Sequence, residues 1–157
     1  MDAGKTFAEF VARWVKSTPP PKDAATAFAS VEQAASVTLP AAYKAFVSKY
    51  GTPSTTIELL DAIVAGKHAI ADVQEFLEVE KLPELTAMYE SGGMDPGFLG
   101  FASDCMGNMF LFRRADCVPG VEDAPVWFFD HDFVTVEEEA PSFVEWLARY
   151  LEIRREG

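Results

Sequence analysis

The sequence between Phe98 and Leu147 decides the fold class of this chain. It begins with the apolar run Phe98-Leu99-Gly100-Phe101-Ala102, and after a turn containing Gly107-Asn108 the run Met109-Phe110-Leu111-Phe112 follows. A third run is Val126-Trp127-Phe128-Phe129. Short apolar runs separated by polar turns are typical of strands in a hairpin or meander. Because the Met109 run has no polar alternation, we expect it to be a central strand covered on both faces.

An acidic edge and a helix follow these strands. We expect a short edge strand over Val134–Val136, which Glu137-Glu138-Glu139 blunts against pairing with other chains. The closing helix begins with a capping box formed by Ser142 and Glu145. Its predicted buried face consists of apolar residues at helical spacing: Phe143, Trp146, Leu147, Tyr150 and Leu151. This half of the chain therefore predicts a sheet followed by one helix.

Helical spacing dominates the chain before the sheet, beginning near the N-terminus. Apolar side chains there fall on one helix face: Phe7, Phe10, Val11, Trp14 and Val15. Thr6 and Glu9 have the spacing of a capping box, and Pro19-Pro20-Pro21 ends the helix. We expect this helix to dock on the main domain or to be loosely tethered to it. The predicted organisation is an N-terminal helix and proline linker over residues 1–22, and one domain over residues 23–157.

Between the proline linker and the sheet, the sequence predicts mainly helices. They are expected at residues 24–35, 40–51, 59–64, 70–77 and 85–89, with a short strand at 55–57. In the second of them, Pro40 suits the first turn and Gly51 suits the cap. Helices first, a sheet in the middle and a helix last predict the α+β class.

The composition fits one folded domain outside the membrane. The chain has 157 residues, of which 49% are hydrophobic and 13% aromatic, so it is long enough to bury a core. No apolar run approaches the roughly 20 residues that span a bilayer, and Glu9, Arg13 and Lys16 interrupt any signal-peptide core. Cys105 and Cys117 are the 2 cysteines, and both are expected to pack as small apolar residues. These features predict a reduced, cytoplasmic setting and no membrane partner.

The formal net charge of −12 is concentrated towards the C-terminus. Residues 1–60 carry 6 basic and 5 acidic side chains, whereas residues 116–157 carry 3 and 11. The acids that we take as candidate partner-binding residues are Asp116, Glu122, Asp123, Asp130, Asp132, Glu137, Glu138 and Glu139. A field of this sign repels nucleic acid and attracts a basic partner. The alternative is that the acidity only keeps the protein soluble.

Asp130-His131-Asp132 is the one cluster in the sequence with potential for metal or acid–base chemistry. Carboxylate and imidazole groups can ligate zinc or manganese, and Asp104 could join them. Adjacent residues on a strand point to opposite faces, however, so at most two of the three side chains converge. We therefore favour a structural role, in which the two aspartates bond the turn backbone and His131 caps the sheet, over a metal or hydrolytic site.

Other catalytic signatures are missing from the sequence. No serine has the strand–turn–helix setting of a nucleophile elbow, and no Gly-rich loop has the pattern that holds a phosphate. We expect no catalytic residue, no bound metal and no cofactor.

Five motifs in the same order resemble the SUKH superfamily, which is named after the fungal Smi/Knr cell-wall regulators. The motifs are Leu39-Pro40 leading to Gly51, Leu99–Ala102 with Asp104, Gly107-Asn108 before Phe110, Phe129-Asp130-His131-Asp132, and Ser142-Phe143 with Trp146-Leu147. The resemblance covers roughly Ala24 to Ile153. It implies a single α+β domain with a mostly antiparallel sheet of about four to six strands flanked by helices, to which this chain adds an N-terminal helix. A long helical interval over 57–96 and the acidic run 137–139 depart from the family pattern.

The resemblance also implies a function, because many bacterial members look like immunity proteins that bind and neutralise a cognate toxin. We expect this chain to be such a non-catalytic binder, a monomer or weak homodimer whose eight candidate acids meet a basic toxin. If the toxin is a nuclease, an acidic inhibitor can mimic its phosphate substrate, and complementary charge speeds encounter. The alternatives are a regulatory scaffold or adaptor like the fungal namesakes, and a self-associating domain without a toxin partner.

Overall fold

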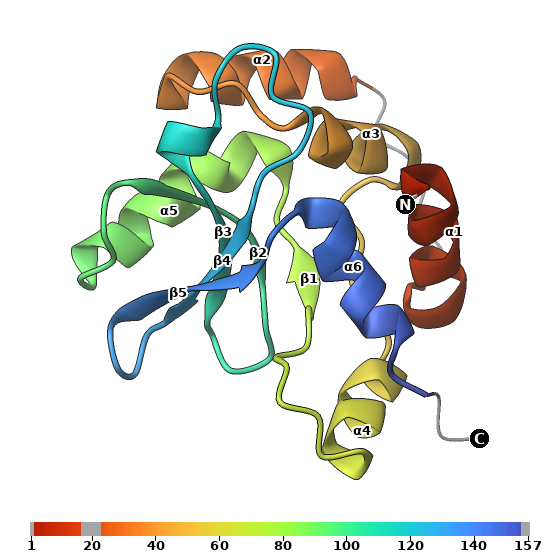
Figure 1. The fold of residues 1–157 in the computed structure, drawn as a ribbon. Helices are drawn as coiled ribbons and strands as arrows, with labels where there is room; N and C mark the ends of the chain where they lie inside the picture. The colour runs from red at the N-terminus through yellow and green to blue at the C-terminus, as the bar shows by residue number, and fades with distance from the viewer. Residues whose placement is uncertain (1, 17–22, 155–157) are drawn as a thin grey trace.

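The computed structural model describes residues 2–16 and 23–154, so the predicted proline linker lies outside the described residues. Within these residues the helices are α1 (Ala3–Trp14), α2 (Ala24–Ala35), α3 (Ala41–Tyr50), α4 (Ile57–Ala65), α5 (Leu82–Ser91) and α6 (Phe143–Leu151), with the 3-10 helices η1 (Val79–Lys81) and η2 (Arg114–Asp116). The strands are β1 (Glu75–Phe76), β2 (Phe98–Ser103), β3 (Met109–Arg113), β4 (Val126–Asp130) and β5 (Thr135–Ala140). Figure 1 shows this arrangement, and the predicted α+β class is confirmed.

The sheet is an antiparallel meander in which each strand pairs with its neighbours in sequence, in the order β1-β2-β3-β4-β5. The central strand is β3, and Met109 to Phe112 are all buried, so the prediction of a strand covered on both faces is confirmed. The β2–β3 register shifts between Gly100 and Ala102. At Gly100 a side chain would overlap the thioether of Met109, so glycine lets the strands approach closely.

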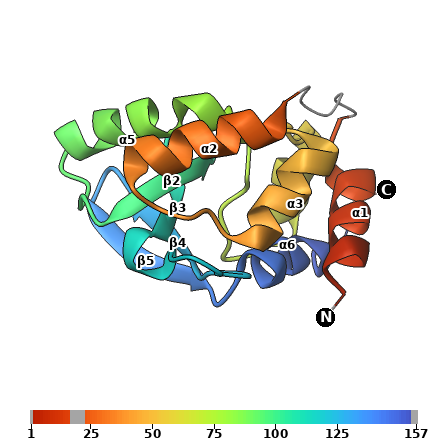
Figure 2. The same cartoon turned by 90° about the horizontal axis from the view of Figure 1, so that it is seen from above.

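Helices cover the two faces of the sheet unequally. Alternation along β3 sends Phe110 and Phe112 to one face, where their rings meet Trp146 and Phe143 of α6. The opposite face lies against α5, where the backbone N–H of Gly100 donates to Thr86 Oγ1 at 3.0 Å. Figure 2 shows α2 and α5 side by side over one face, with α6 on the other side and α1 and α3 at its end. The β4–β5 hairpin extends beyond these helices at the lower left of Figure 1.

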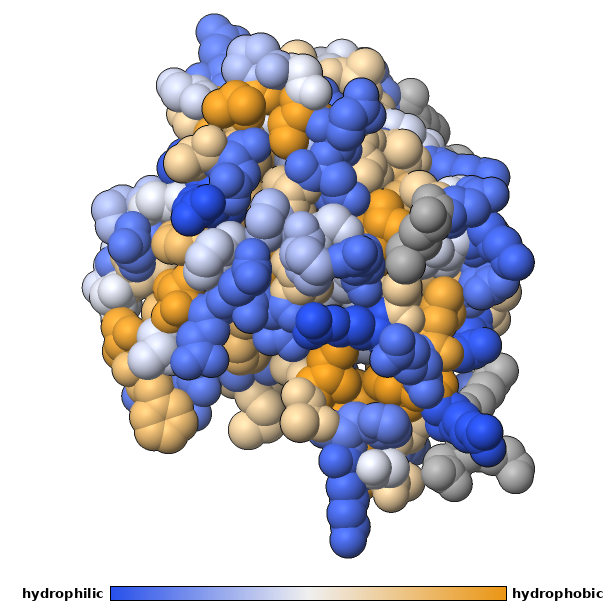
Figure 3. Space-filling view, viewed as in Figure 1, coloured by the Kyte–Doolittle hydropathy of each residue, from blue (hydrophilic) through white to orange (hydrophobic). Residues whose placement is uncertain are grey.

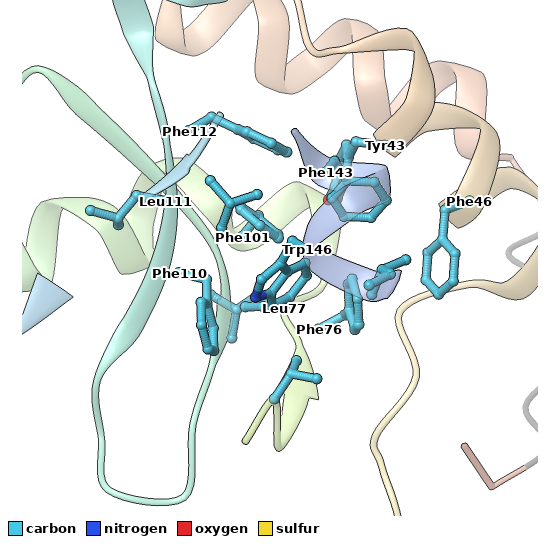
Figure 4. Close-up of a cluster of buried hydrophobic side chains, with 14 of the residues drawn as sticks. Tyr43, Phe46, Phe76, Leu77, Phe101, Phe110, Leu111, Phe112, Phe143 and Trp146 are labelled. Carbon is cyan, nitrogen blue, oxygen red and sulfur yellow. The ribbon is translucent and has the colours of Figure 1, made fainter. Parts of the chain in front are cut away.

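The core is an aromatic cluster built around α6, as Figure 4 shows. Phe143 and Trp146 have no exposed surface, and they lie among rings from α3 and from the sheet. Ser142 begins the helix by accepting a hydrogen bond from the backbone N–H of Glu145 at 3.0 Å, which is the first bond of the predicted capping box. Of the predicted buried face only Leu151 is half-buried, and the other residues are buried.

The opening helix is docked against the main domain. Phe7, Phe10 and Trp14 of α1 are buried, and Trp14 Nε1 donates to the Tyr150 carbonyl of α6 at 3.0 Å. Its predicted capping box is wrong, because the N-cap is Asp2, whose carboxylate accepts from the Lys5 backbone N–H at 3.1 Å. The helix therefore begins about one turn before Thr6, at the Asp2 cap, and Thr6 is buried within the helix.

Two predictions between residues 52 and 81 are wrong. Ile57 belongs to α4, and residues 54 and 55 form only isolated bridges in place of a strand. The predicted helix over 70–77 is instead an extended segment containing β1. Its backbone bonds go to distant partners, since Gln74 N donates to the Ser103 carbonyl at 2.8 Å and Leu77 N to that of Phe101 at 3.0 Å. Pairing with β2 thus outweighs a helix-like spacing of apolar residues.

Details of the remaining predictions also differ. Cys117 is buried as expected, but Cys105 is exposed in the β2–β3 loop, so its predicted packing role is wrong. The predicted edge strand extends further than expected, because β5 continues through Glu137, Glu138 and Glu139 to Ala140. No helix in the described part of the chain is both long and apolar enough to cross a bilayer.

Candidate partner-binding surface

The eight candidate acids fall into two groups along the chain, one before β4 and one from its last residue onward. One group, in the connection between β3 and β4, consists of Asp116, Glu122 and Asp123. The other lies on the β4–β5 hairpin and consists of Asp130, Asp132, Glu137, Glu138 and Glu139. Antiparallel pairing leaves Asp130 and Asp132 at the far end of β4 from the first group, whereas β5 returns Glu138 to the start of β4, opposite Trp127.

The first group mostly stabilises the fold. Asp123 Oδ1 accepts from the backbone N–H of Phe143 at 2.8 Å and Oδ2 accepts from that of Val144 at 3.3 Å, so this carboxylate caps the start of α6. Asp116 accepts two hydrogen bonds from the Arg113 guanidinium, at 3.0 and 3.1 Å. Only Glu122 in this group is exposed. These contacts occupy Asp116 and Asp123 within the protein itself.

The hairpin turn, residues 131–134, is shaped by Asp130. Its Oδ1 accepts from the backbone N–H of Asp132 at 2.9 Å and of Phe133 at 3.3 Å, which is the Asx-turn role that we favoured for this residue. Asp132 is exposed, and its Oδ1 lies 3.4 Å from His131 Nε2. Val134 has a φ of 54°, a left-handed conformation that costs a β-branched residue about 1–2 kcal/mol. Strain of this kind gathers at functional turns.

A polar network joins this turn to the β2–β3 loop. Asn108 Oδ1 accepts from the His131 backbone N–H at 3.0 Å and lies 2.7 Å from His131 Nδ1. The Asn108 side-chain amide donates to Asp104 Oδ2 at 3.0 Å, and its backbone N–H donates to Asp104 Oδ1 at 2.8 Å. Asp104 and Asn108 are both buried. The network therefore fixes His131 and Asp104 in structural roles and holds two loops together.

Replacing Asn108 with leucine is expected to lower the free energy of unfolding by about 3 kcal/mol. The change removes the side-chain amide that donates to Asp104 Oδ2 and the oxygen that accepts from the His131 backbone N–H, and an unpaired buried polar atom is costly. Urea denaturation measures the loss, with the exposed Ser91→Ala as a control. A loss below about 1 kcal/mol would mean that the network contributes little to stability.

Exposed apolar side chains gather at the same end of the molecule. The large ones are Met88 of α5, Met106 of the β2–β3 loop, and Phe133 and Val134 of the hairpin turn. Phe133 is 77% exposed. Figure 3 shows orange and tan atoms at the lower left, over the end of the hairpin. Exposed apolar side chains that gather at one end of a molecule are a common feature of interaction sites.

The two glutamates in the middle of β5 lie on opposite faces of the hairpin. Glu137 pairs with Phe128 and Glu138 with Trp127 across the β4–β5 ladder, and successive residues alternate between faces. Both glutamates are exposed. On the face of Glu137, a hollow of about 430 Å³ is lined by Phe128, Asp130, Phe133, Thr135 and Glu137. The hairpin thus carries a hollow lined by both acidic and aromatic side chains.

Glu139 differs from its neighbours because it lies at the β4–β5 register shift and is half-buried. Burial raises the pKa of its carboxyl above the ordinary 4.5, the Arg149 charge lowers it, and Glu137 raises it further. The Arg149 guanidinium also donates to the Glu139 backbone carbonyl. Glu139 therefore interacts mainly with the protein itself and is less available to a partner than Glu137 and Glu138.

Glu139→Gln is expected to stabilise the protein more at pH 7 than at pH 4, by about 0.5 kcal/mol after solvent screening. A raised pKa means that the folded state binds this proton more tightly than the unfolded state. The contribution of Glu139 to stability is thus present below pH 4.5, and it is lost as the pH rises through the pKa of this carboxyl in the folded state. Urea denaturation at both pH values tests this, with Glu84→Gln as an exposed control. An effect of Glu139→Gln that does not change with pH would contradict it.

The geometry offers little for catalysis. Among residues 2–16 and 23–154, no three His, Cys, Asp or Glu side chains gather closely enough to hold a metal ion. The pKa of the Cys105 thiol is raised to about 11, mainly by desolvation and secondly by a hydrogen bond with Asp72. Such a thiol is almost entirely protonated near neutral pH and is a weak nucleophile.

Comparison with known protein families identifies the chain. Residues 24–149 match the SMI1 / KNR4 family (SUKH-1). The match covers most of the chain, so this protein belongs to that family, and the predicted SUKH resemblance is confirmed. Helix α1 lies outside the matched residues. No curated protein matches the sequence.

Sequence reasoning did not assign two structural residues at the hairpin. Asn108 was assigned only to a turn, and Tyr89, whose hydroxyl donates to the Gly107 carbonyl at 2.8 Å, only to a helix face. The signal for Asn108 was present, since a lone polar residue between Gly107 and an all-apolar strand needs a partner.

Proposed function

We propose that this protein is a non-catalytic immunity protein that binds and neutralises a cognate bacterial toxin through the β4–β5 hairpin. Membership of the SMI1 / KNR4 family (SUKH-1) supports an immunity-type or a scaffold-type role. The observation that carries the proposal is the exposed hairpin, where Asp132 adjoins the apolar Phe133, Glu137 lines the same hollow as Phe133, and Glu138 lies on the opposite face. From the eight candidate acids, this observation selects the exposed ones of the hairpin, which are Asp132, Glu137 and Glu138.

The composition of this surface suits rapid capture of a basic protein. Exposed carboxylates steer a positively charged partner and raise the association rate. An aromatic side chain at the centre of an interface supplies much of the binding energy once it is buried. Phe133 can fill the second role while the acids beside it fill the first.

A toxin that acts on nucleic acid fits this surface best among basic partners. Such an enzyme carries a cationic face for phosphates, and the hairpin acids occupy that face by presenting negative charge in place of the substrate. The inhibitor itself repels nucleic acid for the same reason. We place this interaction in the cytoplasm, in keeping with the two free cysteines.

Co-purification with the product of the neighbouring gene, followed by a growth-protection assay, tests the proposal. Immunity genes normally lie beside their toxin genes, so we expect a tight complex that restores growth of cells producing the toxin. A complex without protection would favour the alternative, a regulatory scaffold of the Smi/Knr kind. The absence of both complex and protection would contradict the immunity role.

A further inference from the structure

The outer edge of β5 is open. The strand order places β5 at one end of the sheet and β1 at the other. The β1 edge is continued by the isolated bridges Ser54–Glu75 and Val15–Thr55. Within residues 2–16 and 23–154, no strand other than β4 pairs with β5. An open edge presents a row of backbone donors and acceptors that another chain can pair with.

The edge is open along only part of the strand. At the C-terminal end of β5 the Arg149 guanidinium donates to the Glu139 backbone carbonyl, so this carbonyl already has a hydrogen-bond partner. The remaining residues, 135–138, carry exposed side chains at 135, 137 and 138 and a half-buried one at Val136. This leaves about four residues, or roughly 13 Å of strand, for pairing.

Charge limits which strand can pair with this edge. A second copy of the chain would bring Glu137 and Glu138 against the same glutamates, and like charges on adjacent strands are destabilising. An added strand with lysine or arginine opposite these positions is attracted instead. The charges on β5 therefore disfavour self-association and favour a basic strand.

The hollow beside the edge adds an apolar requirement. It lies on the face of Glu137 and is lined by Phe128 and Phe133, with Asp130 and Glu137 also lining it. A strand added to β5 would present alternate side chains to this face. One apolar side chain entering the hollow, with cations on the opposite face near Glu138, would match both faces of the hairpin.

We propose that β5 binds an extended, basic segment of its protein partner as an additional antiparallel or parallel strand, with an apolar side chain of that segment in the Phe128–Phe133 hollow. The identity of the partner as a toxin rests on the proposed function, whereas the docking mode rests on the open edge. Main-chain hydrogen bonds would supply affinity, and the alternate side chains would supply specificity.

A synthetic peptide tests this docking mode on the full chain. The probe is Thr-Lys-Val-Lys-Phe-Lys-Thr, blocked at both ends, which presents lysines on one face and apolar residues on the other. Its twin is N-methylated at Val and at the Lys that directly follows it. Because adjacent residues point their N–H groups to opposite edges of a strand, both edges lose a donor while the side chains stay the same. Binding is followed by amide chemical shifts and by hydrogen exchange of the protein.

We expect shifts confined to β5 and the Phe128–Phe133 hollow, slower exchange within residues 135–138, and about tenfold weaker binding of the methylated twin. The double variant Glu137→Gln/Glu138→Gln should bind the peptide about fivefold more weakly. The control Glu80→Gln/Glu84→Gln changes the net charge equally at exposed sites and should bind like the natural chain.

Three outcomes would overturn the docking mode: equal binding of the two peptides, shifts centred elsewhere, or no binding at millimolar peptide. Failure of the immunity role is a separate result. Protection by a chain that does not bind the peptide would overturn the docking mode alone. Peptide binding by a chain that neither captures nor neutralises the neighbouring gene product would overturn the immunity role alone.

Discussion

Phe143→Ala is expected to lower the free energy of unfolding by about 4 kcal/mol. Phe143 is fully buried at the start of α6, and the ring centroids of seven other aromatic residues lie within 6.4 Å of its own. These rings come from α1, α3, three strands and α6 itself, as Figure 4 shows in part. Truncation leaves a cavity that all of these elements line, so the surroundings cannot collapse into it easily.

Denaturation in guanidinium chloride, followed by circular dichroism, measures this loss. Phe133→Ala is the matched control, because it removes the same side chain from a position that is 77% exposed, and it should change stability by less than about 0.5 kcal/mol. Similar losses in the two variants would show that the aromatic cluster is not the centre of the core.

Trp14→Ala is expected to cost a comparable amount, about 4 kcal/mol, although α1 lies outside the residues that match the family. The indole of Trp14 is fully buried and donates to the Tyr150 carbonyl of α6 at 3.0 Å. Arg13 adds a second bond between the same elements, from its guanidinium to the Leu151 carbonyl at 2.6 Å. Loss of the indole therefore removes both packing and a buried hydrogen bond.

Trp14→Phe is the intermediate case, since it keeps an aromatic ring but removes the donor and part of the buried indole. We expect it to cost about 1–2 kcal/mol more than a surface substitution, and clearly less than Trp14→Ala. Chemical denaturation of both variants provides the comparison. A cost of Trp14→Ala below about 1 kcal/mol would mean that α1 is an attachment with little part in the stability of the domain.

The sheet and the closing helix could be predicted because their signals are local. The run Met109–Phe112 has no polar residue to turn outward, so burial on both faces follows directly. Ser142 and the apolar spacing after it define α6 in the same way. Local patterns failed over residues 70–77, where apolar residues at helical spacing lie in a segment whose bonds go to β2. Only the partner strand determines that conformation.

The candidate surface could be predicted only in part. The sequence shows which residues are acidic, but it does not show which carboxylates are engaged within the fold. Asp123 binds the backbone of α6, 20 residues further along the chain, and no local signal reveals this contact. The distance of Asp130 and Asp132 from the acids before β4 likewise depends on the direction of β4. The open edge of β5 becomes visible only once the strand order is known.

The most direct test of the immunity role is the dissociation constant between this protein and the product of the neighbouring gene. It is measured for the natural chain, for Asp132→Asn/Glu137→Gln/Glu138→Gln, and for the control Glu9→Gln/Glu80→Gln/Glu84→Gln, which removes the same charge at exposed sites elsewhere. We predict binding about 10- to 100-fold weaker for the hairpin variant, and within about twofold of the natural chain for the control. Equal affinities for the hairpin variant and the natural chain, or no measurable binding by the natural chain, would contradict the proposal that the hairpin neutralises a toxin.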